Sequence, residues 1–331
     1  MKLLSTGGLR SVLFNRYRVF AALTHYGFFS KMEDERYLKL LYQGLIGRPL
    51  HLDPPERFSE KVQWLKLHDK NPVYPVLCDK LAVRDFVSER IGRAYLTEMF
   101  GVWDDPDDID FAALPDRFVL KCTHDSGSTI LCTDPAAFDE AKARRQLRKL
   151  LRRDYSAGGR EWPYHDVPRR VMAEEFLGDA SGTRPDDYKF YCVRGRMLWV
   201  CVCTNRREDT ADYYLCDRAF HPFWTNMTKI GQPETFAPEP PPRFQEMIEL
   251  AERLASGLLH TRVDFYDTVG GIRFGEMTLY DQSGFIPEYE EWFDRLLGRL
   301  LDLHGELQGS ERAQAEILND LRSAFIHPPL A

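Results

Sequence analysis

Two strand-like runs joined by a Gly-Gly turn, residues 261–266 and 272–278, constrain the fold of this chain more than any other feature. Polar and apolar residues alternate on both sides of the turn, a pattern typical of a β-hairpin. Because side chains on a strand point alternately to its two faces, a hairpin that closes around Gly270 fixes which side chains lie opposite one another.

The predicted register brings two carboxylates together. Asp264 lies opposite Glu276, with Cβ atoms about 5 Å apart. Arg262 lies on the same strand face as Asp264, and Thr278 lies on the same strand face as Glu276. Like charges at this distance destabilise a sheet unless a cation lies between them. A hard divalent cation with oxygen ligands suits such a pair. The alternative is a solvated strand face, with both carboxylates turned to water.

Composition excludes several classes of protein. The 331 residues are 44% hydrophobic, so the chain can bury a large core, and its length predicts about two domains or lobes. The balance of 51 acidic against 44 basic residues argues against nucleic-acid binding as the main function. The seven cysteines form neither paired CxxC units nor a disulfide-like framework, which argues against a zinc site and favours a reducing cytoplasm.

The N-terminal region raises the question of membrane contact. No stretch reaches the ~20 apolar residues that span a bilayer. Residues 9–24 do have the apolar spacing of an amphipathic helix, with arginines off the apolar stripe. Such a helix packs on its own domain or on a partner subunit, or it lies on an anionic membrane surface. We therefore expect a cytoplasmic protein, free or peripheral at the inner face of the membrane.

Helical and strand-like patterns follow one another irregularly along the chain. Residues 31–100 favour helices, whereas short strands and hairpins dominate from Arg117 onward, with helices predicted at 138–153 and 244–259. This order predicts an α+β fold and does not fit the regular alternation of a Rossmann fold. The helix at 138–153 is crowded with basic residues, which indicates either a solvated face or a surface for an anionic substrate.

Basic residues and a small-residue turn precede the hairpin. Lys80 opens a predicted helix, Lys121 ends a predicted strand, and Lys189 lies in a later hairpin. A Ser-Gly-Ser-Thr turn at 126–129 offers backbone N–H groups. Lysines neutralise phosphate charge, such a turn donates hydrogen bonds to phosphate oxygens, and carboxylates hold Mg²⁺. The set predicts a nucleotide-phosphate site, although it contains no Walker P-loop motif.

Five sequence phrases follow one another in a fixed order. They are Cys-Asp-Lys80-Leu-Ala-Val-Arg, Phe-Val-Leu-Lys121-Cys-Thr-His-Asp-Ser-Gly-Ser, Asp187-Tyr-Lys189-Phe-Tyr, Arg262-Val-Asp264-Phe-Tyr and Phe274-Gly-Glu276-Met-Thr. This order resembles that of the ATP-grasp superfamily, and most of all its TupA-like branch, named for teichuronopeptide biosynthesis. The resemblance covers about residues 33–300. It implies an ATP-grasp fold, in which two α+β subdomains clasp ATP, with a mainly helical N-terminal region.

The resemblance also implies an arrangement in five segments. They are an amphipathic helical segment (1–30), a helical N-terminal domain (31–115), a first ATP-grasp subdomain on the phosphate-loop side (116–187), a second subdomain with the metal-binding hairpin (188–305), and a C-terminal helix or tail (306–331).

Each matching residue receives an implied role. Lys80, Lys121 and Lys189 would contact the nucleotide, and Arg262 would stabilise the transferring phosphoryl group. The remaining residues form three sets: a loop closing over the triphosphate (His124, Asp125, Ser126, Gly127, Ser128), a hinge strand for adenine (Glu174, Glu175, Phe176, Leu177), and ligands of Mg²⁺ (Asp264, Glu276, Thr278). Thr278 stands where many ATP-grasp ligases have Asn, so a second Mg²⁺ site is less secure than the first.

The implied activity is ADP-forming ligation of a carboxylate to an amine through an acyl-phosphate. The substrates would be an amino acid and a uronic acid or peptide-like acceptor, in the synthesis of a cell-surface polymer. Alternatives are kinase-like transfer to a hydroxyl and a nucleotide-binding pseudoenzyme. A glycosyltransferase is disfavoured because Asp105-Pro-Asp107 follows no strand-like run. Candidates for holding the acceptor are Arg160, Tyr164, Arg206, Arg207, Tyr213 and Tyr214. The alternative is that these residues belong to ordinary surface loops without a binding role.

Overall fold

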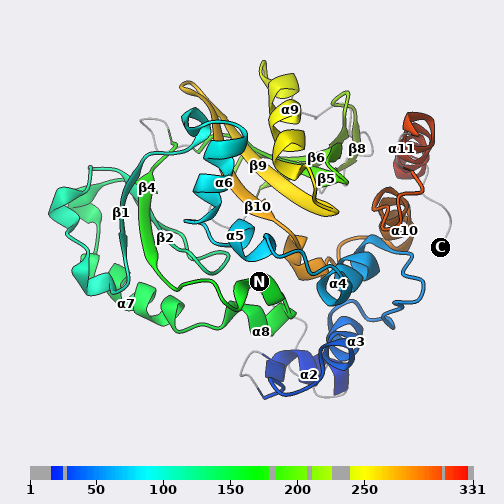
Figure 1. Ribbon diagram of the computed structural model, residues 1–331, viewed down its shortest axis with the longest axis horizontal. Coiled ribbons are helices and arrows are strands. Elements are labelled where there is room, and N and C mark those ends of the chain that lie inside the picture. The colour runs from blue at the N-terminus through cyan, green and yellow to red at the C-terminus, as the bar shows by residue number, and fades with distance from the viewer. Residues whose placement is uncertain are drawn as a thin grey trace. The chain divides into compact units, whose positions relative to one another are not determined.

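The computed structural model describes residues 16–24, 28–178, 184–206, 211–225, 239–307 and 310–326. The chain divides into two compact units, shown together in Figure 1. Unit 1 is drawn from Met1–Asn71, Ser156–His165 and Tyr280–Ala331, and unit 2 from Pro72–Tyr155 and Asp166–Leu279. The arrangement in five segments implied by the sequence stays a prediction.

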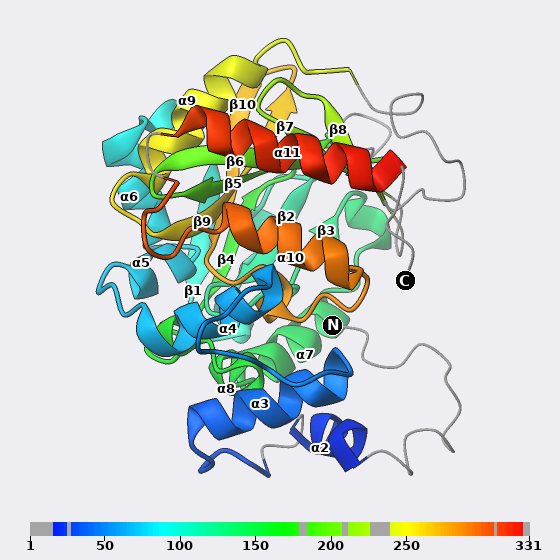
Figure 2. The ribbon, with the colours of Figure 1, turned by 90° about the vertical axis from the view of Figure 1, so that its right-hand side faces the viewer.

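Unit 1 is helical in its described parts, and its helices are seen most clearly in Figure 2. They are α2 (Arg16–Thr24), α3 (Asp34–Leu45), α4 (Phe58–His68), α8 (Tyr155–Gly159), α10 (Glu291–Leu300) and α11 (Glu311–Ile326). Helix α3 begins where the Glu33 carboxylate accepts hydrogen bonds from the backbone N–H groups of Glu35 and Arg36. Leu38 and Leu41 of α3 pack with Phe20 of α2 in one buried cluster. Of the helix expected at 9–24, residues 9–15 lie outside the described residues.

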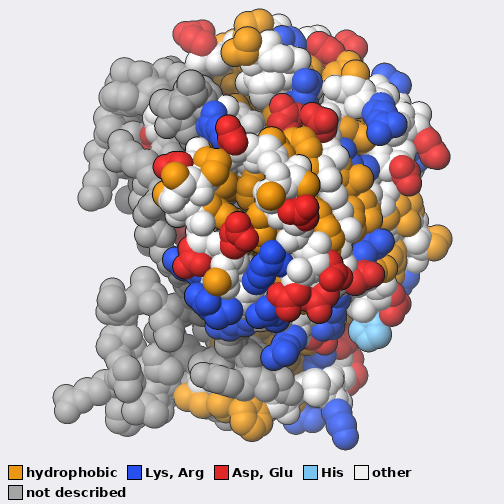
Figure 3. Space-filling model, turned by 90° about the vertical axis from the view of Figure 1, so that its left-hand side faces the viewer, with side chains coloured by type: hydrophobic (Ala, Val, Ile, Leu, Met, Phe, Trp, Pro, Cys, Tyr) orange, Lys and Arg blue, Asp and Glu red, His pale blue; other side chains and the backbone are white. Residues whose placement is uncertain are grey.

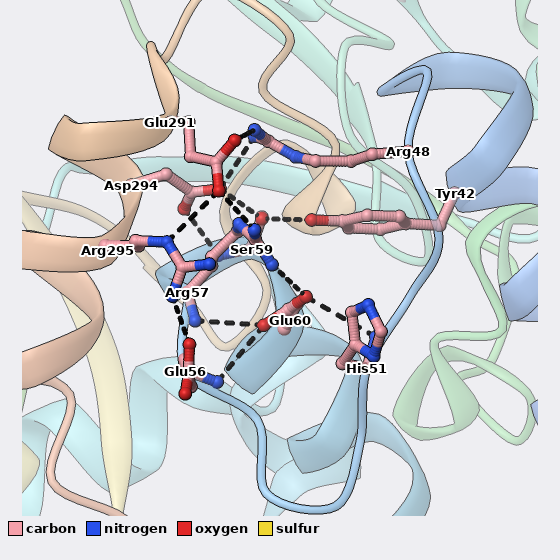
Figure 4. A network of polar contacts seen from close by, with 10 residues as sticks. All are labelled: Tyr42, Arg48, His51, Glu56, Arg57, Ser59, Glu60, Glu291, Asp294 and Arg295. Carbon is pink, nitrogen blue, oxygen red and sulfur yellow. Dashed lines mark hydrogen bonds and ion pairs between the residues drawn. The ribbon is translucent and has the colours of Figure 1, made fainter.

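Buried hydrogen bonds and ion pairs gather where α4 packs on α10 in unit 1 (Figure 4). The Asp294 carboxylate, 1% exposed, accepts from the Ser59 backbone N–H at 2.9 Å and from Arg48 Nη2 at 3.2 Å. The fully buried Glu60 carboxylate accepts from Arg57 Nη1 at 2.7 Å. Burial raises the pKa of Asp294, although the hydrogen bonds from Ser59 and the charge of Arg48 oppose it. Loss of Arg48 or Arg57 would leave a buried carboxylate short of its cation, while the hydrogen bonds from Ser59 to Asp294 hold α4 against α10.

The smaller of two antiparallel sheets in unit 2 has the strand order β1-β4-β2-β3. Its strands are β1 (Met99–Trp103), β2 (Phe118–Cys122), β3 (Ile130–Cys132) and β4 (Val171–Glu175). Helix α7 (Glu140–Leu151) packs on this sheet because Leu147 joins a buried cluster with Phe118 and Leu120. The strands at 118–122, 130–132 and 171–175 and the helix within 138–153 confirm the sequence patterns.

Strand β1 was not predicted, because its first residues belong to a stretch expected to be helical. It pairs with β4, and the register places Val102 opposite Met172. The ground given against a glycosyltransferase was therefore wrong, since a strand does precede Asp105. The structure gives a different argument, since both carboxylates already have partners within the protein. Asp105 Oδ1 accepts from the Asp107 N–H at 2.9 Å to begin a 3₁₀ turn, and the Asp107 carboxylate pairs with Arg148.

The larger sheet has the strand order β10-β9-β5-β6-β7-β8 and is antiparallel throughout. Its strands are β5 (Asp187–Val193), β6 (Arg196–Thr204), β7 (Asp212–Asp217), β8 (Pro222–Thr225), β9 (His260–Thr268) and β10 (Gly271–Thr278). Helix α9 (Phe244–Ala255) packs on it, with the rings of Phe244 and Phe190 stacked at 5.9 Å. Helices α5 (Tyr74–Cys78) and α6 (Val83–Arg90) complete unit 2. None of the described helices is long and apolar enough to cross a membrane.

Candidate functional site

The hairpin of β9 and β10 has the predicted register. Asp264 lies opposite Glu276, and Arg262 lies opposite Thr278. The structure reaches this register through a β-bulge that the sequence pattern did not predict: Phe274 pairs with Phe265, Gly275 is the extra residue, and Glu276 then meets Asp264. A glycine suits the bulge because a Cβ there would lie 3.0 Å from Tyr266 Cε2 and 3.1 Å from the Asp264 carbonyl oxygen.

We expect Gly275→Val to destabilise the protein by about 1–3 kcal/mol, because the larger side chain forces Tyr266 or the Asp264 backbone to move. Gly270→Ala in the same hairpin is the matched control. A Cβ at Gly270 meets nothing closer than 3.4 Å, so its effect should stay within about 0.5 kcal/mol. Urea unfolding measures both variants. Equal effects at the two glycines would show that the close approach at the bulge is not what constrains Gly275.

Arg262 lies between the two carboxylates of the hairpin. Its Nε donates to Asp264 Oδ1 at 2.7 Å, and its Nη2 donates to Asp264 Oδ2 at 2.7 Å and to Glu276 Oε1 at 2.8 Å. Thr278 Oγ1 also donates to Glu276 Oε1, at 3.1 Å. The cation that the paired carboxylates require is therefore supplied, in this structure, by an arginine of the hairpin itself.

Strand β5 extends the same polar face. Lys189 lies opposite Asp264 in the sheet, and its Nζ donates to Asp264 Oδ2 at 2.6 Å and to Asp187 Oδ2 at 2.5 Å. Arg206 Nη1 lies 3.3 Å from the same oxygen of Asp187. Burial raises the pKa of Asp264, but Arg262 and Lys189 together outweigh burial and hold it below its usual value. Three cations thus face the three carboxylates of Asp187, Asp264 and Glu276.

Asp187 is a residue of this cluster that the sequence reasoning missed. Its side chain is 1% exposed, and burial raises its pKa against the opposing charges of Lys189 and Arg206. Strand alternation could have found it, because Asp187 and Lys189 are two residues apart in β5 and so share one face.

The protein's donors suit Mg²⁺ only if the ion has other ligands. No group of three or more His, Cys, Asp or Glu side chains in the described part of the chain is placed to hold a metal ion. Asp264 and Glu276 supply two carboxylates, and Thr278 adds a hydroxyl beside Glu276. Mg²⁺ commonly takes one or two carboxylates and completes its octahedron with phosphate oxygens and waters. The Glu276 side chain is 38% exposed, so an ion from solvent can reach it, and the donor set fits an ion that arrives with phosphate.

Lys80 is tied to the loop that follows β2. It lies in the turn between α5 and α6, not within the helix that it was expected to open. Its Nζ donates to the Asp125 carbonyl oxygen and lies 4.0 Å from Asp125 Oδ1, while its backbone N–H donates to the Thr123 carbonyl at 3.1 Å. Burial lowers the pKa of Lys80, although Glu276 and Asp125 oppose the shift.

Most side chains of the predicted phosphate loop point into the protein. His124 is 2% exposed, and its Nε2 forms a hydrogen bond with the Arg153 carbonyl oxygen at 3.2 Å. Ser128 folds back, since its Oγ accepts from the Cys122 N–H at 2.9 Å. Ser126 and Gly127 are exposed, and Gly127 has φ +84°, which favours glycine. The loop therefore offers a ligand its backbone and the Ser126 hydroxyl more than the other side chains.

Lys121 pairs with the predicted adenine hinge. Its Nζ donates to Glu174 Oε1, and Thr97 Oγ1 donates to Glu174 Oε2 at 3.0 Å, so both oxygens of this carboxylate already have partners. Burial lowers the pKa of Lys121, but Glu174, Tyr266 and Glu276 together outweigh burial and the net shift is upward. Beyond Glu174, the Glu175 N–H donates to the Glu98 carbonyl at 2.9 Å, and the guanidinium of Arg117 lies 4.6 Å from the centre of the Phe176 ring. Leu177 is partly buried.

Glu276 connects the two halves of this arrangement. It accepts a hydrogen bond from Arg262, and its charge favours the protonated form of Lys121 and opposes the downward shift that burial gives the pKa of Lys80. Glu276 of β10 therefore interacts electrostatically with Lys121 of β2, which belongs to the other sheet of unit 2.

The acceptor candidates are divided among different places. Arg206 and Tyr213 belong to unit 2, where Tyr213 lies opposite Cys203 and Cys203 lies opposite Asp187. Because side chains alternate along β7, Tyr214 lies on the other face of the sheet from Tyr213, and it is 3% exposed. Arg160 and Tyr164 belong to unit 1, where the Arg160 guanidinium binds the carbonyl oxygens of Phe29, Ser30 and Met32. Arg207 lies outside the described residues.

Comparisons with known proteins give one matching family and several similar solved structures. A family model described as TupA-like ATPgrasp matches residues 60–302. Similar solved structures include the ATP-grasp ligase PsnB complexed with minimal precursor, at 13% identity and a TM-score of 0.38, covering 74% of this chain and 61% of that one. D-alanine–D-alanine ligase from Bacillus anthracis complexed with ATP matches at 15% identity and 0.36, with coverages of 62% and 55%.

A third similar structure is the ADP complex of purK, N5-carboxyaminoimidazole ribonucleotide synthetase, at 13% identity and a TM-score of 0.39, with coverages of 73% and 56%. The chain spans less than two thirds of the length of each of these three proteins. No curated protein matches the sequence.

Proposed function

Since the chain belongs to the TupA-like ATP-grasp family and has an ATP-grasp fold, we propose that it is an ATP-dependent ligase that joins a carboxylate to an amine. The observation that carries the proposal is the polar face of the hairpin, where Arg262 bridges the carboxylates of Asp264 and Glu276 and where Lys189 also holds Asp264. The charge of Glu276 also interacts with Lys80 and Lys121. Phosphoryl transfer needs cations around the phosphate oxygens and carboxylates for a divalent ion, and this cluster offers both.

Each residue has a distinct task in the proposed reaction. Bound MgATP would supply the phosphoryl group that activates the carboxylate as an acyl-phosphate, which the amine then converts to an amide with release of phosphate. Asp264 and Glu276 hold the cation, and Lys80 and Lys121 neutralise phosphate oxygens. Arg262, at hydrogen-bond distance from both carboxylates, is positioned to offset charge on the transferring group.

The remaining sites follow from the same proposal. The exposed backbone at Ser126 and Gly127 covers the phosphates, and the segment Glu174–Leu177 receives adenine, with Lys189 holding Asp264 in place. The acceptor would be a uronic acid or peptide-like building block of a cell-surface polymer, used in the cytoplasm. Thr278 provides only a hydroxyl for a second Mg²⁺.

The decisive experiment separates the three phosphoryl-transfer outcomes. The protein receives MgATP, pools of amino acids and uronic acids, and hydroxylamine, which replaces the amine and traps an acyl-phosphate as a hydroxamate. ADP together with hydroxamate, and an amide when an amine is present, supports the ligase. AMP formation, or ADP with a phosphorylated hydroxyl, would overturn the proposal in favour of adenylation or a kinase. Tight MgATP binding without turnover on any pool would favour a pseudoenzyme.

A further inference from the structure

Helix α7 and Arg152, the residue that caps its C-terminus, carry four exposed cations on one face. They are Lys142, Arg145, Lys149 and Arg152, hereafter the basic stripe. At 3.6 residues per turn their spacing of three, four and three residues places them together, opposite the buried Ala143 and Leu147. Helix α7 lies on the left in Figure 1, and Figure 3, which faces that side, shows Lys and Arg side chains gathered in a band.

The basic stripe has no neutralising partner among the residues that the structure describes. None of its four side chains forms an ion pair with any described residue, whereas the flanking Arg148 pairs with Asp107 and Arg144 binds the Pro106 and Ile109 carbonyls. Cations near a helix C-terminus are favourable, but Lys142 lies in the first turn of α7, where the helix dipole disfavours it, and Arg145 lies too far from the C-terminus to gain from the dipole. The protein as a whole has a net charge of −7. Neither helix stability nor overall basicity therefore explains the stripe.

The stripe leads to the proposed phosphate loop. Arg153, next to the last residue of the stripe, accepts the hydrogen bond from His124 through its carbonyl oxygen. The exposed Arg169 lies at the same end, where its Nη1 donates to the Leu151 carbonyl at 3.4 Å. From Lys142 to Arg152 the helix advances about 15 Å. A ligand lying along the stripe would thus reach the loop with one end.

We propose that the basic stripe binds an anionic chain, one end of which reaches the proposed phosphate loop. The inference rests on the proposed function for the role of that chain, which would be the acceptor of the ligase, but its binding requires no turnover. Single exposed ion pairs contribute little, so four cations over this length favour a ligand with several linked charges over one small anion. A membrane-binding helix would carry exposed large apolar side chains, and α7 carries none.

Binding is measured by fluorescence anisotropy with three labelled chains, each long enough to span the stripe. Oligoglutamate and oligogalacturonate test carboxylate chains, and polyphosphate tests phosphate chains. The quadruple variant Lys142→Gln/Arg145→Gln/Lys149→Gln/Arg152→Gln removes the charges and keeps helix propensity. We expect it to bind about tenfold more weakly, or weaker still. Added salt should weaken binding by the wild-type protein. The matched control removes the same charge at exposed positions of unit 1, through Lys31→Gln/Lys39→Gln/Arg299→Gln/Arg312→Gln, and should change binding less than about twofold.

Several outcomes would overturn the inference. Equal weakening of binding in both variants would indicate an effect of bulk charge. Absence of binding to all three chains would also contradict the inference. Binding to phosphatidylglycerol vesicles alone would indicate a lipid surface. Circular dichroism confirms that both variants are folded. ADP formation is measured separately from binding. If the chains bind through the stripe but no nucleotide is turned over, only the proposed function is contradicted. If nucleotide is turned over but no chain binds through the stripe, only this inference is contradicted.

Discussion

Replacing Glu276 by Gln is expected to lower ATP turnover about 10²–10³-fold, with the free energy of unfolding changed by less than about 1 kcal/mol. The side chain is 38% exposed, and a neutral amide of the same shape still accepts hydrogen bonds from Arg262 and Thr278. What it no longer provides is the charge that a divalent cation needs. ADP release and urea unfolding measure the two quantities on the same preparation.

Asp264→Asn should differ from Glu276→Gln in stability, not in activity. Asp264 is 2% exposed and holds Arg262 and Lys189, so its neutralisation leaves one buried and one partly buried cation short of a partner and costs about 3–5 kcal/mol. Glu252→Gln in α9 is the control, because Glu252 is likewise paired with an arginine, Arg218, but is 26% exposed. Normal turnover in the Glu276 variant would remove that residue from the metal site.

Local periodicity explains how much of the site could be predicted. Alternation in residues 261–266 and 272–278 placed Asp264 and Glu276 on one face of the hairpin, and closure around Gly270 then set them opposite each other; the bulge at Gly275 left no signal in the pattern. The helix on which Lys142 lies and the hairpin that contains Lys189 were predicted for the same reason. In each case the pattern that identifies the element lies within about 20 residues of sequence.

Contacts between distant segments could not be predicted in this way. Strand β1 is short and owes its conformation to pairing with β4, about 70 residues later in the chain. The pairing of Lys121 with Glu174 depends on the same sheet, and nothing in either local pattern announces it. Burial of His124 and Asp125 in the phosphate loop likewise follows from packing that a polar sequence conceals.

A buried lysine in unit 1 has no place in the proposed reaction. Lys66 is 1% exposed, and its Nζ donates to Gln63 Oε1 at 3.0 Å, to the Gly159 carbonyl at 2.7 Å, and to the carbonyl and hydroxyl oxygens of Ser283 at 2.7 and 2.8 Å. Burial lowers the pKa of Lys66 to about 7, and the carboxylate of Glu161 opposes that shift. Ser283 has φ +57°, a strained conformation for a residue with a side chain. The lysine therefore holds two separate chain segments, and one strained residue, against α4.

Lys66→Met is accordingly expected to destabilise unit 1 by about 3–5 kcal/mol, because it leaves buried oxygen atoms and the Glu161 carboxylate without their cation. Urea unfolding measures the loss. Lys70→Met, four residues further along and beyond the end of α4, is the control: Lys70 is exposed, so its replacement should cost less than about 1 kcal/mol although it also contacts a carbonyl and an aromatic ring. In the double variant Lys66→Met/Glu161→Gln, removal of both charges should recover about 1–3 kcal/mol relative to the sum of the single changes. Strict additivity would mean that Glu161 is not the charge that Lys66 compensates, and the cost would then belong to the carbonyl oxygens alone.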